Sequence, residues 1–403
     1  MATQTASNYL VNFKVESTEG TAATGGASTG ERLRTVASPG LKLSRATVRS
    51  AEKRNDANKA PSRLGGKSVA GSYNVEVNVD SFSTLIEAAM RSTWVAAATT
   101  TFNNGAALTS ITVDSSSQLT FAGTTVPTAF GLRVGDVFRL ASMSDAANND
   151  INLTVKTISG SVVTVWGTPL TAQAADIACT LTIQKKIAQA TTPTRRTFTV
   201  EQYLEDADVS EQFVGCRVVS MSFAFQPNSM VTATFGFVGL NRTALATGSS
   251  PYFTSPTEYT SINLVADDAS ISYNGALVTT LTGWTVNFTI DAAGQPVLGS
   301  LVAPGTYDND LMVEGSCSGT ITDFSDLTLW DAETTFEMRI MLVEPDAAAP
   351  VNFMHLFFPQ VKIMDISGEL GGDAAYVQTR TLEFQPKVAA TGYDAGVCTI
   401  SIA

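Results

Sequence analysis

The alternation of apolar and polar residues along this chain predicts many short strands and few helices. From Val75 to Val79 the odd positions are apolar and the even positions Glu76 and Asn78 are polar, which is the period of a half-buried strand. Similar runs recur to the C-terminal end, and clusters of Gly, Pro, Asn and Asp separate them. The pattern is typical of a mainly β protein with polar turns.

One segment after this strand has helical spacing instead. Five apolar residues fall on a single face of the expected helix: Phe82, Leu85, Ile86, Ala89 and Met90. Asp80 or Ser81 is expected to cap its N-terminus, and Glu87 and Arg91 are expected to point outward. We expect this packing helix to lie on the sheet of its own unit.

Two stretches of the chain are similar to two later ones. Residues 69–95 match 313–334 at offsets of 242 to 244, so that Gly71 corresponds to Gly315. Residues 213–239 match 358–386 at an offset of only 145. The difference of 97 residues is close to the length of the Thr-, Ala- and Ser-rich stretch between the first two segments, which suggests an insertion there.

The offsets predict two tandem β-sandwich or barrel units, each with a short flanking helix. The first unit would be discontinuous, with residues 1–95 and 192–250, and the second would comprise residues 251–403. Residues 96–191 would form an inserted β domain, because six short strand candidates separated by turns suit a small barrel or sandwich.

Charge is distributed unevenly. The chain has a net charge of −12, yet residues 31–67 carry ten Lys and Arg against three acidic residues. Residues 49–68 show no apolar periodicity, and they predict a long basic loop between two strands. The candidate contact residues in and beside this loop are Arg45, Arg49, Lys53, Arg54, Lys59, Arg63 and Lys67.

This loop admits three interpretations: docking on an acidic neighbouring copy, contact with nucleic acid, or plain solvation. Nucleic-acid binding favours aromatic residues among the basic ones, and none lies between Arg32 and Ser72. The basic arm and the acidic remainder of the chain favour docking between copies.

No residue pattern predicts catalysis, a cofactor or a metal site. The single histidine, His355, lies in an apolar run and is expected to be packed in the core or an interface. The four cysteines are far apart, and the donors of residues 145–150 lack the glycine and glutamate of a calcium loop. We expect a protein that is not an enzyme. With no signal peptide or long apolar run, synthesis in the cytoplasm is expected.

The order of these segments resembles that of a known family. A basic segment from Arg45 to Lys67 leads into an alternating strand from Val69, and a helix from Phe82 to Trp94 follows at once. In this respect the chain resembles the tail tube (major tail) protein of long non-contractile tailed bacteriophages, the siphophages. The resemblance covers residues 40–95 well and the C-terminal half more loosely.

The resemblance implies a structural virion protein. In that family six units close a ring whose inner strands line a channel for DNA, and rings stack through a long loop at the position of residues 49–68. Two units per chain would then give trimeric, pseudo-hexameric rings. The corresponding second loop, Ala293 to Asp310, has no Lys or Arg and would make contacts of another kind.

The implied partners are further copies of the chain, other tail proteins at the tube ends, and double-stranded DNA passing without specific binding, with no membrane. The implied location is the virion tail, assembled in the bacterial host cytoplasm, with the inserted domain on the outer surface. The alternative is a carbohydrate-binding or adhesive β-rich surface protein acting through the inserted domain.

Overall fold

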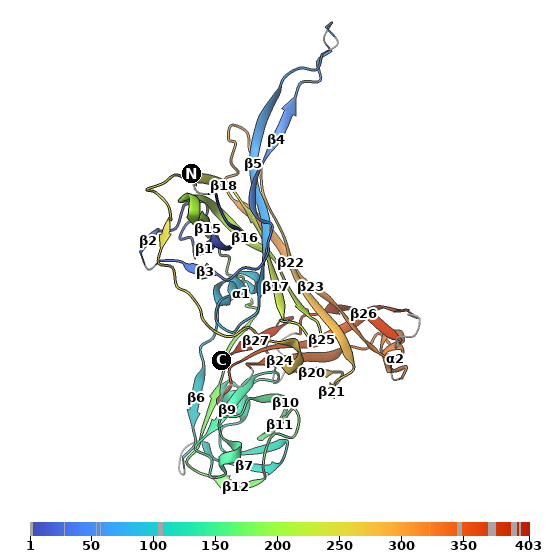
Figure 1. The fold of residues 1–403 in the computed structure, drawn as a ribbon. Coiled ribbons are helices and arrows are strands. Elements are labelled where there is room, and N and C mark those ends of the chain that lie inside the picture. The colour runs from blue at the N-terminus through green and yellow to red at the C-terminus, as the bar shows by residue number, and fades with distance from the viewer. Residues whose placement is uncertain are drawn as a thin grey trace.

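The protein is built mainly from antiparallel strands, as the sequence predicts, with two short α-helices in the described residues (Figure 1). The computed structural model describes residues 3–27, 29–53, 55–56, 58–103, 108–321, 323–344, 349–369, 376–387, 393–394 and 396–403. Most strands belong to one large sheet, and a separate sheet lies at the opposite end from a long projecting hairpin.

The large sheet has the following strands in the first part of the chain: β1 (Tyr9–Val15), β3 (Glu31–Leu33), β4 (Gly40–Arg49), β5 (Ser62–Glu76), β14 (Lys185–Ala188), β15 (Phe198–Leu204), β16 (Val209–Phe225), β17 (Thr232–Gly239) and β18 (Asn241–Leu245). Its later strands are β20 (Ala269–Tyr273), β21 (Ala276–Val278), β22 (Leu281–Gly294), β23 (Thr306–Thr320), β24 (Phe336–Val343), β25 (Phe353–Glu369), β26 (Val377–Phe384) and β27 (Thr399–Ile402). The helices are α1 (Ser83–Met90) and α2 (Ser325–Asp331). The short strands β2 (Gly26–Ala27) and β19 (Phe253–Thr254) pair with each other.

A continuous series of antiparallel strands crosses both halves of the chain. Its order is β4, β5, β17, β16, β22, β23, β26 and β25. We call this series the long sheet run. It exists because β16 is long enough to pair with β17 of its own half and, near its C-terminal end, with β22 of the other half.

The two halves of the long sheet run have the same strand register. Ser72 of β5 lies opposite Gly236 of β17, and Ser316 of β23 lies opposite Thr381 of β26. These pairs differ by 244 and 145 residues, which are offsets found in the sequence.

The irregularities of the ladders also correspond. β16 has a register shift between Val218 and Ser220, and β25 has one between Ile363 and Asp365, again 145 residues later. The hairpin β4–β5 shifts between Arg45 and Thr47, and the hairpin β22–β23 shifts between Ile290 and Ala292. Because a bulge re-aims the strand that contains it, both halves bend at corresponding places.

Close strand contact explains why glycine occupies two matched positions. A Cβ atom at Gly71 would collide with the carbonyl oxygen of Gly40, and one at Gly315 would collide with that of Thr285. Both glycines sit where the following strand of a hairpin crosses its partner. The repeated Gly-Ser pair therefore reflects a shared steric requirement.

The remaining sheet is formed by residues within the expected insertion. Its strands are β6 (Ala98–Thr101), β7 (Leu108–Ser115), β8 (Gln118–Gly123), β9 (Val137–Ala141), β10 (Leu153–Ser159), β11 (Val162–Val165), β12 (Gln173–Asp176) and β13 (Thr180–Ile183). They enclose their own buried cluster, which touches the rest of the chain through Phe357 of β25. β14, although inside residues 96–191, pairs with β27 in the large sheet.

Candidate functional site

The long sheet run has one apolar and one polar face. A row of opposed residues on the apolar face is buried in the main core: Val75, Ala233, Phe223, Val286, Gly315, Leu382 and Ile363. The next row along the strands faces the other way: Glu76, Thr232, Ala224, Thr285, Ser316, Thr381 and Asp365. We call the surface that contains this second row the polar face.

Short hydroxyl and amide side chains cover most of the polar face. A second row on it contains Asn74, Thr234, Ser222, Asn287, Glu314, Glu383 and Lys362. Neighbours along these rows hydrogen-bond to one another, as Thr285 and Ser316 do at 2.9 Å and Thr234 and Asn74 do at 3.0 Å. In the second row the basic group, Lys362, bonds Glu333 at 2.6 Å. The described rows therefore present hydroxyls and carboxylates, and little positive charge.

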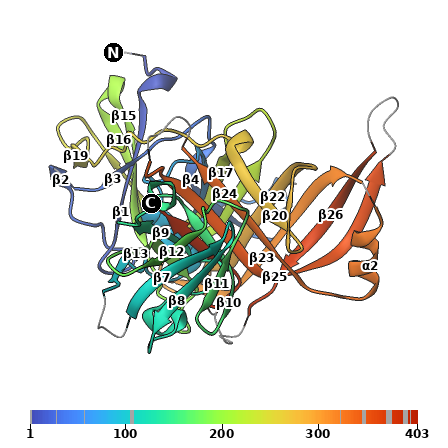
Figure 2. The ribbon, with the colours of Figure 1, turned by 90° about the horizontal axis from the view of Figure 1, so that it is seen from below.

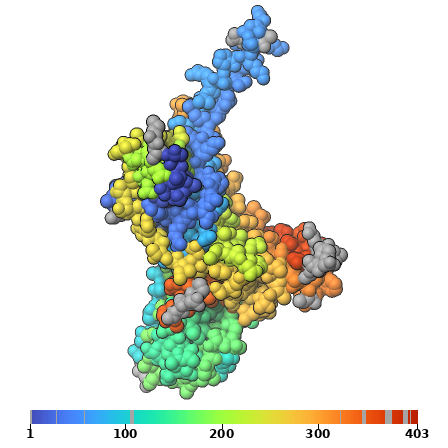
Figure 3. Space-filling view, in the orientation of Figure 1, coloured from blue at the N-terminus to red at the C-terminus, as the bar shows by residue number. Residues whose placement is uncertain are grey.

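The basic segment forms the outer part of a hairpin that projects from the body (Figures 1 and 3). Its strands run to Arg49 and resume at Ser62, so the loop proper is residues 50–61. The expectation of a loop over residues 49–68 is therefore wrong at its C-terminal side. Backbone pairing extends the hairpin because Val48 and Arg63 still lie opposite each other.

The seven candidate contact residues are not equivalent. Arg49, Lys53, Lys59 and Arg63 are exposed on the outer part of the hairpin. Lys67 is partly buried, and its Nζ donates to Asn241 Oδ1 at 2.9 Å. The other two candidates are Arg45, whose guanidinium lies 3.5 Å from the carbonyl oxygens of residues 64 and 65, and Arg54, which is outside the described residues.

The second hairpin, β22–β23, ends in an apolar loop. The loop is residues 295–305 and is shorter than the expected loop from Ala293 to Asp310, because β22 reaches Gly294 and β23 begins at Thr306. Leu298 is fully exposed and Leu301 is half exposed. The carbonyl oxygen of Leu301 accepts from the Lys67 amide at 2.7 Å, which holds this loop against β5.

The expected packing helix corresponds to α1. Leu85, Ile86, Ala89 and Met90 are buried in it, and Phe82 packs on Phe235 with ring centroids 5.8 Å apart. The predicted cap is wrong, because Phe82 itself occupies the N-cap position and no side chain caps the helix.

Glu87 and Arg91 do not point outward, contrary to the prediction. Arg91 adopts a left-handed conformation at the helix end, and its side chain, 11% exposed, pairs with Asp308 at 3.4 Å. Glu87 accepts from the Trp94 amide at 2.9 Å and pairs with Arg196 at 3.2 Å. Helical spacing cannot anticipate this, since the backbone leaves the helix at Arg91.

Asp308 joins the two halves of the chain electrostatically. Besides Arg91, it binds Arg195 at 2.6 Å and Arg217 at 3.1 Å, while Arg217 also binds Glu19 at 3.4 Å. Asp308 belongs to β23, whereas its three partners belong to the first half of the chain. These contacts fix the second hairpin against the end of α1, and no local motif in the sequence indicates them.

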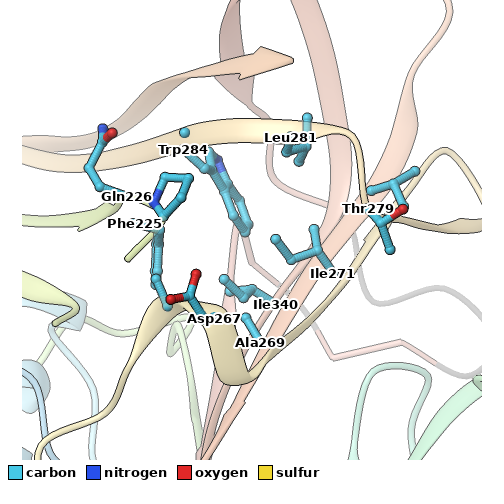
Figure 4. Close-up of a pocket in the computed structure, with 13 residues that line it drawn as sticks. Phe225, Gln226, Asp267, Ala269, Ile271, Thr279, Leu281, Trp284 and Ile340 are labelled. Carbon is cyan, nitrogen blue, oxygen red and sulfur yellow. The ribbon is translucent and has the colours of Figure 1, made fainter. Parts of the chain in front are cut away.

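A small cavity of about 250 Å³ lies where β16 hands over to β22 (Figure 4). Phe225, Trp284 and Ile340 form its apolar wall. Its acidic lining residue, Asp267, already accepts from the Asn228 amide at 3.1 Å. The cavity thus lacks a group placed for acid–base chemistry, and it is a packing gap beside the junction of the halves.

The other titratable groups of interest are interior. His355 is fully buried, stacks on Phe357, and has a pKa well below its usual range because of burial and the nearby Arg339. Within the described residues, no three His, Cys, Asp or Glu side chains gather in a way that could hold a metal ion. The described geometry is that of an assembly surface.

Comparison with known families gives a match over nearly the whole chain. The family model of the phage tail tube protein matches residues 7–386. The chain belongs to this family. Comparison with curated proteins gave no match. Membership makes the chain a structural component of the virion tail, which assembles with itself into a tube and contacts other tail proteins. It points away from enzymatic activity.

For a tail tube protein the inserted sheet is an added element, and its aromatic residues are interior. Phe102, Phe121 and Phe138 are buried, and Phe130 packs edge-on against Phe102 at 6.2 Å. They do not form the exposed aromatic platform that the carbohydrate-binding alternative needs. In the part of the tail tube chain that the structure describes, no helix is long and apolar enough to cross a membrane.

An ion cluster that the sequence did not reveal anchors the inserted sheet. Lys186 of β14 donates to both oxygens of Asp136, at 2.7 and 2.8 Å, and to Asp394 at 2.7 Å. Asp136 is 1% exposed and immediately precedes β9 of the inserted sheet. The three residues are far apart in the sequence, so only the fold brings them together.

Proposed function

We propose that this tail tube protein forms rings of three chains that stack into a tube, with the polar face of the long sheet run lining a channel through which DNA passes. The observation that carries the proposal is the row from Glu76 to Asp365, which crosses seven strands without a basic residue. Lys and Arg contacts with phosphate dominate nonspecific DNA affinity. A hydroxyl and carboxylate wall would let DNA slide.

Two units per chain support a ring of three chains. The long sheet run contains two sets of strands with the same register and the same bulges, and the sets are joined edge to edge through β16 and β22. A repeat of this join between chains generates a closed ring by rotation. Six units at two per chain give a trimer.

The β4–β5 hairpin is proposed to dock on an adjacent ring. Its outer part carries exposed Arg49, Lys53, Lys59 and Arg63, and it extends beyond the rest of the body (Figure 3). The remainder of the chain is acidic, so the hairpin would meet a surface of opposite charge. The second hairpin would contribute apolar contacts through Leu298.

The inserted sheet is proposed to lie on the outside of the tube. Val137 packs with Met341 and Phe353, and Gly135 lies against the ring of Phe357. These partners belong to β24 and β25, on the buried side of the second half and not on the polar face. An external position leaves the channel clear.

Electron microscopy of the purified full-length chain tests the ring. Hollow rings with threefold symmetry, alone or stacked in tubes, are expected. A chain that stays monomeric at high concentration would contradict the proposed function.

Charge reversal tests the docking hairpin. The combined change Arg49→Glu, Lys53→Glu and Lys59→Glu should leave rings intact and prevent their stacking. The matched control Arg49→Lys, Lys53→Arg and Lys59→Arg keeps the charge and should stack normally. Normal tube growth by the first variant, with unchanged salt dependence, would refute the docking role.

A further inference from the structure

We propose that neighbouring protomers close the ring by repeating, between chains, the strand junction that joins the two halves within one chain. This inference rests on the proposed ring and goes further, since it names the two edges, their register and an ion pair across them.

The internal junction supplies the template. The end of β16 and the start of β22 pair antiparallel, from Ser220 opposite Thr289 to Phe225 opposite Trp284. Phe223 and Val286 are opposed on the buried face. The junction thus continues both the ladder and the core from one half into the other.

Each strand of the template has a counterpart with an unpaired edge. β25 corresponds to β16, and the segment from Asp365 to Gly368 pairs only with β26 among the described strands. β4 corresponds to β22 and, in the same part of the chain, pairs only with β5. These edges end the long sheet run, and open edges of this kind are templates for pairing with another chain.

The internal offsets fix the register between chains. β25 follows β16 by 145 residues, and β22 follows β4 by 245, because Val286 opposes Gly315 as Leu41 opposes Gly71. The template then places Ser367 of one protomer opposite Lys42 of the next, and Ile366 opposite Leu43.

The faces of these residues agree with this register. Ser367 and Lys42 are both exposed, whereas Ile366 and Leu43 are both half-buried and pack against the main core. A slip of one residue would turn Ile366 onto the polar face, which the alternation of a strand does not tolerate cheaply. Asp365, beside Ser367 on the polar face, also brings a carboxylate diagonally close to Lys42.

An ion pair of reversed polarity accompanies the junction. Within the chain, Arg91 at the end of α1 binds Asp308 of β23 at 3.4 Å. The counterpart of Arg91 is Glu333, which follows α2 and has a φ of 50° where Arg91 has 51°. The counterpart of Asp308 is Leu64, since each residue lies at the shifted position of its hairpin.

A cation lies beside Leu64. Arg45 Nη2 is 3.5 Å from the Leu64 carbonyl oxygen, and Arg45 is exposed in the single chain. Glu333 has a side chain that is 76% exposed, with Lys362 as its partner at 2.6 Å. The acid and the base have exchanged sides, so Glu333 of one protomer pairs with Arg45 of the next.

Exposed apolar groups next to the β25 edge fit the same occupant. Phe324 is 71% exposed and Met364 is 47% exposed, whereas Phe82, the counterpart of Phe324, is 2% exposed. Trp330 Nε1 donates to the Met364 carbonyl at 3.3 Å, which places α2 beside the unpaired edge. A second copy on this edge would shield Met364 from water.

Cysteine cross-linking tests the register directly. The variant Lys42→Cys with Ser367→Cys should, on mild oxidation of assembled rings, convert most of the monomer into covalent trimers in denaturing gels. The four native cysteines are buried, so their background is low. The variant Ser222→Cys with Asn287→Cys is the internal positive control, because these residues are known strand partners.

A displaced pair gives the negative control. Ser44→Cys with Ser367→Cys is diagonal in the proposed register, and diagonal Cβ atoms are roughly 7–8 Å apart, beyond disulfide reach. If rings form and the internal control cross-links, while the displaced pair links as well as the proposed one, the register is wrong. If the wild-type chain forms no rings, the proposed function itself fails.

Charge exchange tests the ion pair. Glu333→Arg should raise the protein concentration needed for ring formation by at least about tenfold, because like charges would then face each other. Adding Arg45→Glu should restore ring formation to within about threefold of wild type. Asp268→Arg, an exposed reversal elsewhere, is the control and should change it little. Equal defects in the single and double variants would overturn the pairing.

Discussion

Replacement of Lys186 by methionine should destabilise the chain by about 3 kcal/mol at pH 8. The substitution keeps the apolar stem and removes the ammonium group that bonds Asp136 at 2.7 and 2.8 Å. Asp136 is 1% exposed and would keep the Arg133 amide, at 2.8 Å, as a donor. An uncompensated buried carboxylate is costly, whereas the intact pair need not be strongly stabilising.

The deficit should depend on pH with a defined sign. Burial raises the pKa of Asp136 to about 6, against the lowering effect of Lys186, and without Lys186 the pKa should rise further. A folded pKa above the unfolded value means that stability falls as pH rises, until the folded pKa is passed. The deficit should therefore open between pH 6 and pH 8, by up to about 1.4 kcal/mol per pH unit.

Urea unfolding of the full-length chain at pH 5, 6.5 and 8 measures this dependence. At pH 5 the Asp136 carboxyl should be largely neutral in both proteins, so the deficit should fall to about 1 kcal/mol, from the lost contact with Asp394. Lys185→Met is the matched control, because Lys185 lies over the Trp94 ring at 4.8 Å and its loss should cost about 1 kcal/mol at every pH. A Lys186→Met deficit no larger than the control's at pH 8, or equal at pH 5 and pH 8, would refute the reasoning.

Two further predictions concern the core. His355→Phe should flatten the acid limb of stability in melts between pH 5 and pH 7, because burial lowers the folded pKa and the unfolded chain takes up a proton below about pH 6.5, at up to about 1.4 kcal/mol per pH unit; an unchanged limb would show that other groups cause it. Gly71→Ala should cost about 1–3 kcal/mol in urea unfolding, since its Cβ would strike the Gly40 carbonyl. Gly66→Ala, where the nearest atom is 3.9 Å away, is the control, and equal costs would contradict the steric explanation.

The sequence predicted the mainly β architecture because strand alternation is a local signal. The spacing of Leu85, Ile86 and Met90 marked the position of α1 for the same reason, although the capping and the direction of Arg91 did not follow. Capping depends on the backbone conformation at Phe82, and the direction of Arg91 depends on a left-handed residue that ends the helix. Neither is encoded in apolar periodicity.

The contacts between distant parts of the chain were beyond sequence reasoning. Asp308 binds Arg91 and Arg217 because the hairpin β22–β23 passes over the end of α1, and a single sequence carries no local trace of that crossing. The basic segment was found from its charge alone. Its hairpin geometry was missed because residues 62–68 pair through the backbone, which requires no apolar alternation at an exposed edge.

The two hairpins of one chain are unequal, and this inequality has a consequence for how rings are oriented. The long hairpin carries a basic tip, whereas the short one ends in the apolar loop around Leu298 and lies against its neighbour. In a ring of three chains, long and short arms would alternate around the rim. An incoming ring would then find three equivalent seats and not six, since a half-step places a basic arm where an apolar one belongs. The hairpins would act as a key that sets the angle between successive rings, and every ring added would inherit that angle from the one beneath it.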